Sequence, residues 1–267
     1  MAHIAQRRFG QNFLTDKNIA KKIIKQAEIA DNETVIEIGP GQGAITVLLS
    51  EVAKKVFAIE LDRNLIQGLE ALAGVHRNIS IIPGDALKCY EEVVRRIGRD
   101  PYLVVANIPY NITSAIIRTI LTTTPVASRV VLMVQKEVAQ RMVSKPGDMN
   151  LLALSVQLYG DVRKCFDVAP GSFSPQPNVM SAVIEITPHK KNNISEMDPE
   201  KILSIARGAF AKKRKLLASN LAETTSHPKS EIVEILTRCA IPTNARAQNL
   251  SVKQWAQLCE ELESDRT

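Results

Sequence analysis

The sequence predicts an α/β fold, with a parallel, doubly wound sheet followed by a small all-α C-terminal domain. Apolar runs of strand length alternate with helix-like segments through the first half of the 267 residues, and this alternation is typical of a parallel sheet with crossover helices. A glycine-rich turn separates the first run from the helix after it. From residue 199 onward the apolar spacing is helical to the end of the chain, which indicates a separate helical domain.

Five short apolar runs are the predicted parallel strands. They are TVIEI (34–38), VFAIE (56–60), ISIIP (79–83), YLVVAN (102–107) and RVVLMVQ (129–135). Helical spacing precedes the first run over 17–29 and follows it around 44–53. Two further β-rich runs, LALSVQLYG (152–160) and VMSAVIEIT (179–187), have no helix between them. They predict an antiparallel hairpin that finishes the sheet.

The composition and the apolar periodicity of the sequence change after Pro188. The segment HKKNNISEMDPE is polar, lacks an apolar period and ends in an Asp-Pro helix-start signal. We therefore predict an α/β domain over 1–188, a linker over 189–198 and a helical domain over 199–267. The helices expected in the last part run roughly over 199–221, 229–240 and 251–263.

The composition limits the class of protein. A hydrophobic fraction of 45% is ordinary for a globular core, and 34 Lys and Arg against 28 Asp and Glu suggest a polyanionic partner. The four cysteines form no C-x-x-C pair, so we expect no metal site and no disulfide framework. No apolar run approaches the ~18 residues of a membrane span, and the N-terminus lacks a signal-peptide core. We expect a cytoplasmic protein without membrane contact.

The turn EIGPGQG (37–43) is the first candidate binding element. It follows a strand and opens a helix, where glycines allow backbone N–H groups to approach a ligand. Its G-x-G-x-G spacing is one residue shorter than the dinucleotide pattern. Glu60, at the end of the second strand, can accept both hydroxyls of a ribose, and Asp85, after the third, can accept an adenine amine. Either acid alone could be a solvated loop carboxylate, but together they indicate an adenosine-containing ligand. This set resembles the Rossmann-like class I S-adenosylmethionine-dependent methyltransferases, and the resemblance implies that Gly39 and its neighbours contact the methionine part.

The motif NIPY (107–110) ends the fourth strand, where parallel sheets place reacting groups. An exocyclic base amine is a poor nucleophile, because its lone pair is delocalised into the ring. The Asn107 side-chain oxygen and a backbone carbonyl, that of Ile108, can accept its two N–H groups and favour a pyramidal nitrogen. Pro109 stiffens the turn, and Tyr110 offers a face on which the base can stack. These residues predict methyl transfer to a base amine.

A second aromatic residue belongs to the same hypothesis. FSPQPNV (173–179) brackets Phe173 with prolines beside the last predicted strand. Phe173 can stack on the second face of a base that is flipped out of its strand, opposite Tyr110. A core phenylalanine in a proline-rich connection is the alternative.

Six segments together resemble the ribosomal RNA adenine N6,N6-dimethyltransferases, of the KsgA type. They are RRFGQNFL (7–14), EIGPGQG, IELD (59–62), GDAL (84–87), NIPYNITS (107–114) and FSPQPNV. The C-terminal runs GAFAKKRKLLASNL (208–221) and RAQNLSVKQW (246–255) extend the resemblance. It implies an enzyme that dimethylates two adjacent adenosines near the 3′ end of 16S rRNA in the assembling 30S subunit. We expect this enzyme to be a monomer. The resemblance also brings Asn12 and Leu14, in a segment that closes over the cofactor, into the binding set with Gly41.

Two alternatives stay open at this stage. Relatives with the same NIPY-type site methylate large-subunit rRNA and confer antibiotic resistance. A non-catalytic assembly or nucleic-acid-binding factor is the other alternative, against which the intact Asn107 and Tyr110 argue.

A basic run in the C-terminal domain is the predicted RNA contact. Residues 201–222 contain six Lys or Arg and no acid, whereas solvated helix faces usually interleave Glu with Lys. We expect Lys212, Lys213, Arg214 and Lys215 to bind rRNA phosphates. Lys213 stands where the resembling family usually has arginine, which changes the geometry of a phosphate contact but keeps the charge.

Overall fold

The computed structural model describes residues 12–109, 112–189, 194–195 and 197–264. The chain divides into two compact units. The first comprises 1–139 and 162–188, and the second 140–161 and 189–267. In the division predicted from the sequence, all residues before 189 belong to the α/β domain. The structure instead groups 140–161 with the C-terminal helices.

The first unit is built around a seven-stranded sheet in the order β4-β3-β2-β5-β6-β9-β7. Its strands are β2 (Thr34–Ile38), β3 (Lys55–Glu60), β4 (Ile79–Pro83), β5 (Tyr102–Asn107), β6 (Arg129–Gln135), β7 (Gly160–Val168) and β9 (Ser181–Pro188). The first five are parallel to one another, and β9 runs antiparallel to β6. The five predicted parallel strands are confirmed. The order reverses between β2 and β5, which is where open α/β sheets bind ligands.

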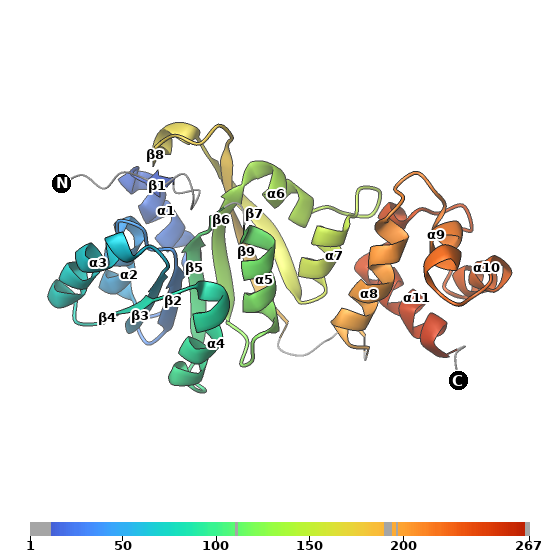
Figure 1. Ribbon diagram of the computed structural model, residues 1–267, viewed down its shortest axis with the longest axis horizontal. Helices are drawn as coiled ribbons and strands as arrows, with labels where there is room; N and C mark the ends of the chain where they lie inside the picture. The colour runs from blue at the N-terminus through green and yellow to red at the C-terminus, as the bar shows by residue number, and fades with distance from the viewer. Residues whose placement is uncertain (1–11, 110–111, 190–193, 196, 265–267) are drawn as a thin grey trace. The chain divides into compact units, whose positions relative to one another are not determined.

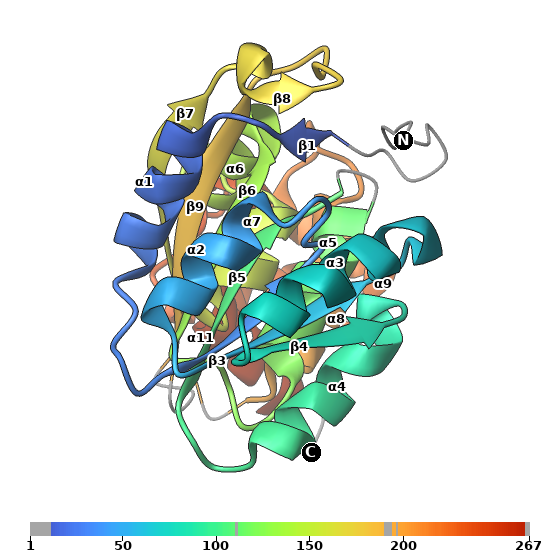
Figure 2. The ribbon, with the colours of Figure 1, turned by 90° about the vertical axis from the view of Figure 1, so that its left-hand side faces the viewer.

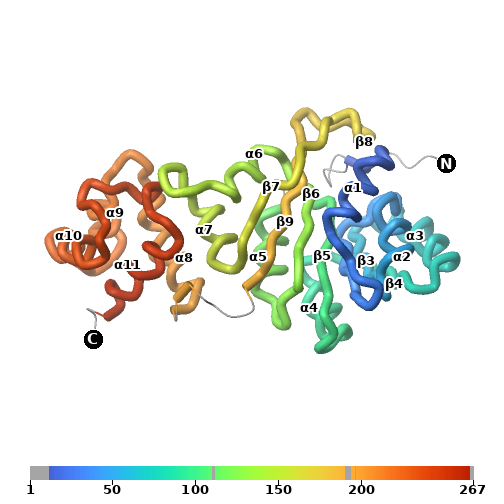
Figure 3. The backbone as a smooth tube through the Cα atoms, turned by 180° about the vertical axis from the view of Figure 1, so that it is seen from behind, coloured from blue at the N-terminus to red at the C-terminus, as the bar shows by residue number. Residues whose placement is uncertain are grey.

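Helices cover both faces of this sheet. They are α1 (Lys17–Ala27), α2 (Ala44–Val52), α3 (Arg63–Val75), α4 (Ala86–Ile97), α5 (Thr113–Thr122) and α6 (Lys136–Met142). In Figure 1, α4 and α5 lie in front of the strands, whereas α1 lies in front of them in Figure 3, which is seen from behind. The central strands are buried from both sides, since all five residues of β2 are buried, and this explains their nearly continuous apolar sequence.

A second, two-stranded sheet joins the N-terminal segment to a distant loop. Strand β1 (Phe13–Leu14) pairs antiparallel with β8 (Phe173–Ser174), which follows the short 3₁₀ helix η3 (Pro170–Ser172). Figure 2 shows the two short strands side by side. Runs of two residues carry no readable alternation, so sequence periodicity could not predict this pairing.

The hairpin predicted between 152–160 and 179–187 is wrong for its first strand and confirmed for its second. The second run forms β9, as expected, but the first is the helix α7 (Leu151–Gln157). Leu152, Leu154 and Val156 alternate as in a strand, but the N-cap decides the structure, because the Asn150 side chain accepts the N–H of Ala153 at 3.1 Å. The strand adjacent to β9 is β7 instead.

The C-terminal helices of the second unit are α8 (Pro199–Phe210), α9 (Leu217–Thr224), α10 (Lys229–Arg238) and α11 (Val252–Ser264), with the 3₁₀ helix η4 (Ala247–Asn249). They pack with α7 around Trp255, whose ring lies 5.3 Å from that of Phe210 between centroids. The single helix predicted over 199–221 is wrong, because the chain leaves the helical conformation between α8 and α9. No helix in the described ranges is long and apolar enough to cross a membrane.

Candidate active site

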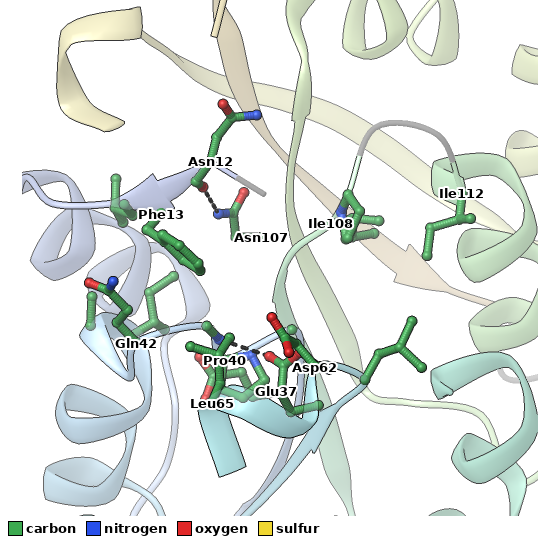
Figure 4. A pocket seen from close by; sticks show the side chains of 18 residues that line it. Asn12, Phe13, Glu37, Pro40, Gln42, Asp62, Leu65, Asn107, Ile108 and Ile112 are labelled. Carbon is green, nitrogen blue, oxygen red and sulfur yellow. Dashed lines mark hydrogen bonds between the residues drawn. The ribbon is translucent and has the colours of Figure 1, made fainter. Parts of the chain in front are cut away.

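A pocket opens at the carboxyl ends of β2, β3 and β5, where the strand order reverses (Figure 4). Its lining comes from the N-terminal segment, the glycine turn, the end of β3 and the residues after β5. The lining residues are Asn12, Phe13, Leu14, Glu37, Gly39, Pro40, Gly41, Gln42, Ala44, Ile45, Glu60, Leu61, Asp62, Leu65, Asn107, Ile108, Pro109 and Ile112. Six of the predicted cofactor-binding residues are therefore brought together: Asn12, Leu14, Gly39, Gly41, Glu60 and Asn107.

The turn after β2 needs its glycines for conformation and for space. Gly39, Gly41 and Gly43 have φ of +72°, +59° and +85°, in the left-handed region that side chains disfavour. A Cβ added at Gly41 would lie 3.0 Å from the Phe13 ring. The turn ends at Gly43, the N-cap of α2, so unpaired N–H groups of the first helical turn lie beside the pocket.

Glu60 holds the turn to the end of β3. Its Oε2 accepts the N–H of Gly41 at 3.1 Å, and its Oε1 accepts the N–H of Asp62 at 2.8 Å. Burial raises the pKa of Glu60, while the hydrogen bonds from Asp62 and Gly41 lower it. A carboxylate has about four acceptor sites, so both oxygens can also accept hydroxyl groups from a ligand in the pocket.

Glu37 lines the same pocket, although the sequence analysis assigned it no role. It lies in β2, is 1% exposed, and its Oε2 has no hydrogen-bond partner. Burial raises the pKa of Glu37 to about 8; the nearby Thr46 hydroxyl opposes this shift, and the charge of Glu60 adds to it. An acid inside the otherwise apolar run TVIEI was the signal available in the sequence. Phe13, Gln42 and Asp62 are further lining residues that the sequence analysis missed.

Asn107 is the last residue of β5 and is half-buried. Its Nδ2 donates a hydrogen bond to the backbone carbonyl of Asn12 at 3.2 Å, as Figure 4 shows. The next residue, Ile108, is fixed by a hydrogen bond from its N–H to the carbonyl of Met133 in β6, at 3.2 Å. Tyr110 lies outside the described residues, so its predicted stacking role stays a prediction.

Two predicted site residues do not line this pocket. Asp85 is the N-cap of α4 and accepts the N–H of Leu87 at 3.0 Å, so its role toward adenine also stays a prediction. Phe173 is only 3% exposed and belongs to the hydrophobic core of the sheet unit, with β1 paired against it. A ring covered in this way offers no open stacking face. The burial of the ring favours the alternative, a core phenylalanine, and the stacking role of Phe173 stays a prediction.

The predicted RNA-contact residues lie on a loop between α8 and α9 and not on a helix. We call residues 211–216 the basic loop. Asn220, which is 2% exposed, donates from Nδ2 to the carbonyls of Ala209 and Lys212 at 2.8 and 3.1 Å. The first bond satisfies a carbonyl in the last turn of α8, and the carbonyl of Lys212 also accepts the N–H of Lys215 at 3.0 Å, so Asn220 ties the loop to both helices and holds it in one conformation.

The four cations of the basic loop fall into two pairs. Lys212 and Lys215 both form ion pairs with Glu223, and these contacts lower the pKa of Glu223 to about 2. The acid missing from 201–222 thus lies just beyond that range. Lys213 and Arg214 are exposed, and the described part of the chain gives them no ion-pair partner. These two residues are the cations available to a ligand.

The chain matches the family described as "Ribosomal RNA adenine dimethylase" over residues 2–264. It is 39% identical over 264 residues to the protein named "Ribosomal RNA small subunit methyltransferase A" of Lachnoclostridium phytofermentans, covering 96% of this chain and 91% of that one. The protein of the same name from Fusobacterium nucleatum is 39% identical over 259 residues, with 95% and 96% covered.

Solved structures give the same result at the level of the fold. A dimethyladenosine transferase from Plasmodium falciparum superimposes with a TM-score of 0.82 at 27% identity, covering 95% of this chain and 98% of that one. The 23S rRNA methyltransferase ErmE superimposes with a TM-score of 0.75 at 25% identity, covering 94% and 100%. The Rossmann-like methyltransferase fold is therefore confirmed.

Proposed function

Because the chain belongs to the ribosomal RNA adenine dimethylase family, we propose that it transfers methyl groups from S-adenosylmethionine to N6 of adenosines in small-subunit rRNA. The products are two adjacent N6,N6-dimethyladenosines near the 3′ end of 16S rRNA, made during assembly of the 30S subunit. The single observation that carries this proposal is the position of Asn107. It lies at the carboxyl end of β5 and lines the same pocket as the glycine turn and Glu60.

The pocket fits an adenosine-containing methyl donor. Glu60 presents a carboxylate that can accept the ribose hydroxyls, and Gly41 leaves open the space that a Cβ would occupy. Asn12 lies on the side opposite the glycine turn in Figure 4, and Leu14 is a further lining residue. Asp85 is proposed to accept the adenine amine. When bound, S-adenosylmethionine supplies an electrophilic methyl group on a sulfonium.

The residues after β5 act on the target base. The Oδ1 of Asn107 and the carbonyl of Ile108 accept the two N–H groups of the adenine amine, which turns its nitrogen lone pair toward the methyl group. These two acceptors would hold N6 in line with the methyl–sulfur bond of a bound methyl donor, whose sulfur would keep the electron pair of that bond, and N6 would lose its proton to solvent once methylated. Catalysis comes mainly from alignment of the two reactants.

Replacing Asn107 by alanine tests this proposal. Transfer of tritiated methyl groups to undermethylated 30S subunits should fall by about 10²–10³, because a positioned hydrogen bond in the transition state is lost. Undermethylated 50S subunits are the second substrate. Labelling of 50S but not 30S subunits by the wild-type protein would support the large-subunit alternative. Wild-type rates in the Asn107→Ala variant would refute the role of this residue, and absence of labelling by the wild type would support the non-catalytic factor.

We also propose that the basic loop of the second unit binds rRNA phosphates. The support is the exposed pair Lys213 and Arg214, on a loop that Asn220 holds in one conformation. The change Lys213→Ala with Arg214→Ala, which removes two positive charges, should weaken binding to 30S subunits and flatten its dependence on salt. The matched control is Lys212→Ala with Lys215→Ala, which removes the lysines already paired with Glu223 and should weaken binding less. If both double variants lose the same affinity for 30S subunits, the distinction between available and Glu223-paired cations is refuted.

A further inference from the structure

We propose that the backbone carbonyl of Asn12 orients the side-chain amide of Asn107, so that the N-terminal segment is a positioning element for methyl transfer. This inference rests on the proposed function, because it concerns how Asn107 presents its oxygen to the adenine amine. Asn12 would act through Asn107 and not on the reacting atoms, so it is a positioning residue. Its contribution comes from the main chain, which no pattern of side chains reveals.

The hydrogen bond between the two residues determines which end of the amide faces the base. A backbone carbonyl can only accept, so the NH₂ group of Asn107 must face Asn12 at 3.2 Å (Figure 4). The oxygen is then left for another partner, and no donor among the described residues contacts it. Rotation about the terminal bond of an asparagine is broad and roughly two-fold. Without Asn12, the amide could turn its NH₂ toward the adenine amine, and two donors would face each other.

The Asn12 carbonyl is itself held in place from both sides of the pocket. The residues that follow it form β1, which pairs with β8, and the N–H groups of Thr15 and Asp16 both donate to the carbonyl of Ser172, at 2.9 and 3.3 Å. Phe13 packs with Leu65 and Leu69 against the opposite wall. Because these contacts fix the four residues that follow Asn12, the carbonyl has a defined position from which to select the rotamer of Asn107.

This arrangement explains why residue 107 is an asparagine and not an aspartate. The adenine amine needs only an acceptor, which either residue supplies, but the Asn12 carbonyl needs a donor. An ionised aspartate has acceptors only, so one of its oxygens would face the Asn12 oxygen at hydrogen-bond distance and be repelled. A protonated aspartic acid again offers one donor and one acceptor, as asparagine does. Its O–H can donate to the Asn12 carbonyl while its carbonyl oxygen accepts from the base.

The test is the pH profile of the Asn107→Asp variant in the 30S methylation assay, normalised to the wild type at each pH. At about pH 8 its rate should be as low as that of Asn107→Ala, a loss of about 10²–10³. As the pH falls toward 5.5, its normalised rate should rise by up to about tenfold per pH unit, because the rate follows the fraction of the introduced aspartate side chain that is protonated. Calorimetric titration with S-adenosylmethionine at both pH values checks that each variant still folds and binds.

The control variant is Gln42→Glu, which introduces the same negative charge at another lining residue, whose side-chain amide donates to no backbone carbonyl of the described residues. Its normalised rate should not rise as the pH falls. An Asn107→Asp variant that works at the wild-type rate at pH 8, or one that stays inactive at every pH while binding cofactor, overturns the positioning role. Failure of the proposed function is distinguishable, because the wild-type protein itself would then not label 30S subunits, or Asn107→Ala would label them at the wild-type rate.

Discussion

Replacing Glu37 by glutamine should stabilise the sheet unit at neutral pH, even though the residue lines the binding pocket. The wild-type side chain is buried, with one carboxyl oxygen that has no hydrogen-bond partner. Burial of this kind penalises the charged form of a carboxyl group. Glutamine has almost the same shape and carries no charge at any pH, so the substitution isolates the cost of ionisation.

The magnitude follows from the two pKa values of Glu37. Its ordinary value is 4.5, and burial raises the pKa to about 8 in the folded protein. Between these values the unfolded chain has released the proton while the folded protein keeps it, so the free energy of unfolding falls by about 1.4 kcal/mol per pH unit. Below this window the group is protonated in both states, and its stabilising contribution is complete. From pH 5.5 to 7.5 the wild type should lose roughly 2–3 kcal/mol relative to Glu37→Gln.

The assay is urea unfolding of both proteins at these two pH values, followed by far-ultraviolet circular dichroism. Fluorescence is unsuitable, because the single tryptophan, Trp255, lies in the second unit. Other titrating groups are common to both proteins and cancel in the difference between them. A difference in unfolding free energy that is the same at both pH values would refute the reasoning, since it would mean that Glu37 ionises equally easily in the folded and unfolded chain.

Two further predictions concern single residues. Glu60→Ala should weaken S-adenosylmethionine binding by about 1.5–3 kcal/mol through loss of a charge-assisted acceptor, and calorimetric titration that finds unchanged affinity would place the ribose elsewhere. Gly208→Ala should destabilise the second unit by about 1–3 kcal/mol, because the added Cβ would lie 2.4 Å from Thr224 Oγ1; fluorescence of Trp255 during unfolding measures the loss. The control is Gly74→Ala in the first unit, where an added Cβ meets nothing within 4 Å; far-ultraviolet circular dichroism follows its unfolding, and an equal loss of stability relative to the wild type in both variants would contradict the packing argument.

The sequence by itself determined the parallel sheet and the edge at which the site lies. Strands buried on both faces must be apolar along their whole length, so runs such as TVIEI and RVVLMVQ are readable without a structure. The glycine turn is readable for a similar reason, since three backbone positions with positive φ in seven residues require glycine. Both features depend on neighbours in the chain, and local patterns therefore predict them.

Only the tertiary structure decided which groups meet across long stretches of chain. The contact between Asn12 and Asn107 joins residues 95 positions apart, and the burial of Phe173 depends on the pairing of β8 with β1. The charge of the basic loop was also misread, because Glu223 neutralises two of its lysines from the following helix. Hydrogen bonds, ion pairs and burial depend on distances in space, and a periodicity that predicts where a helix or strand forms contains no information about which distant segment packs against it.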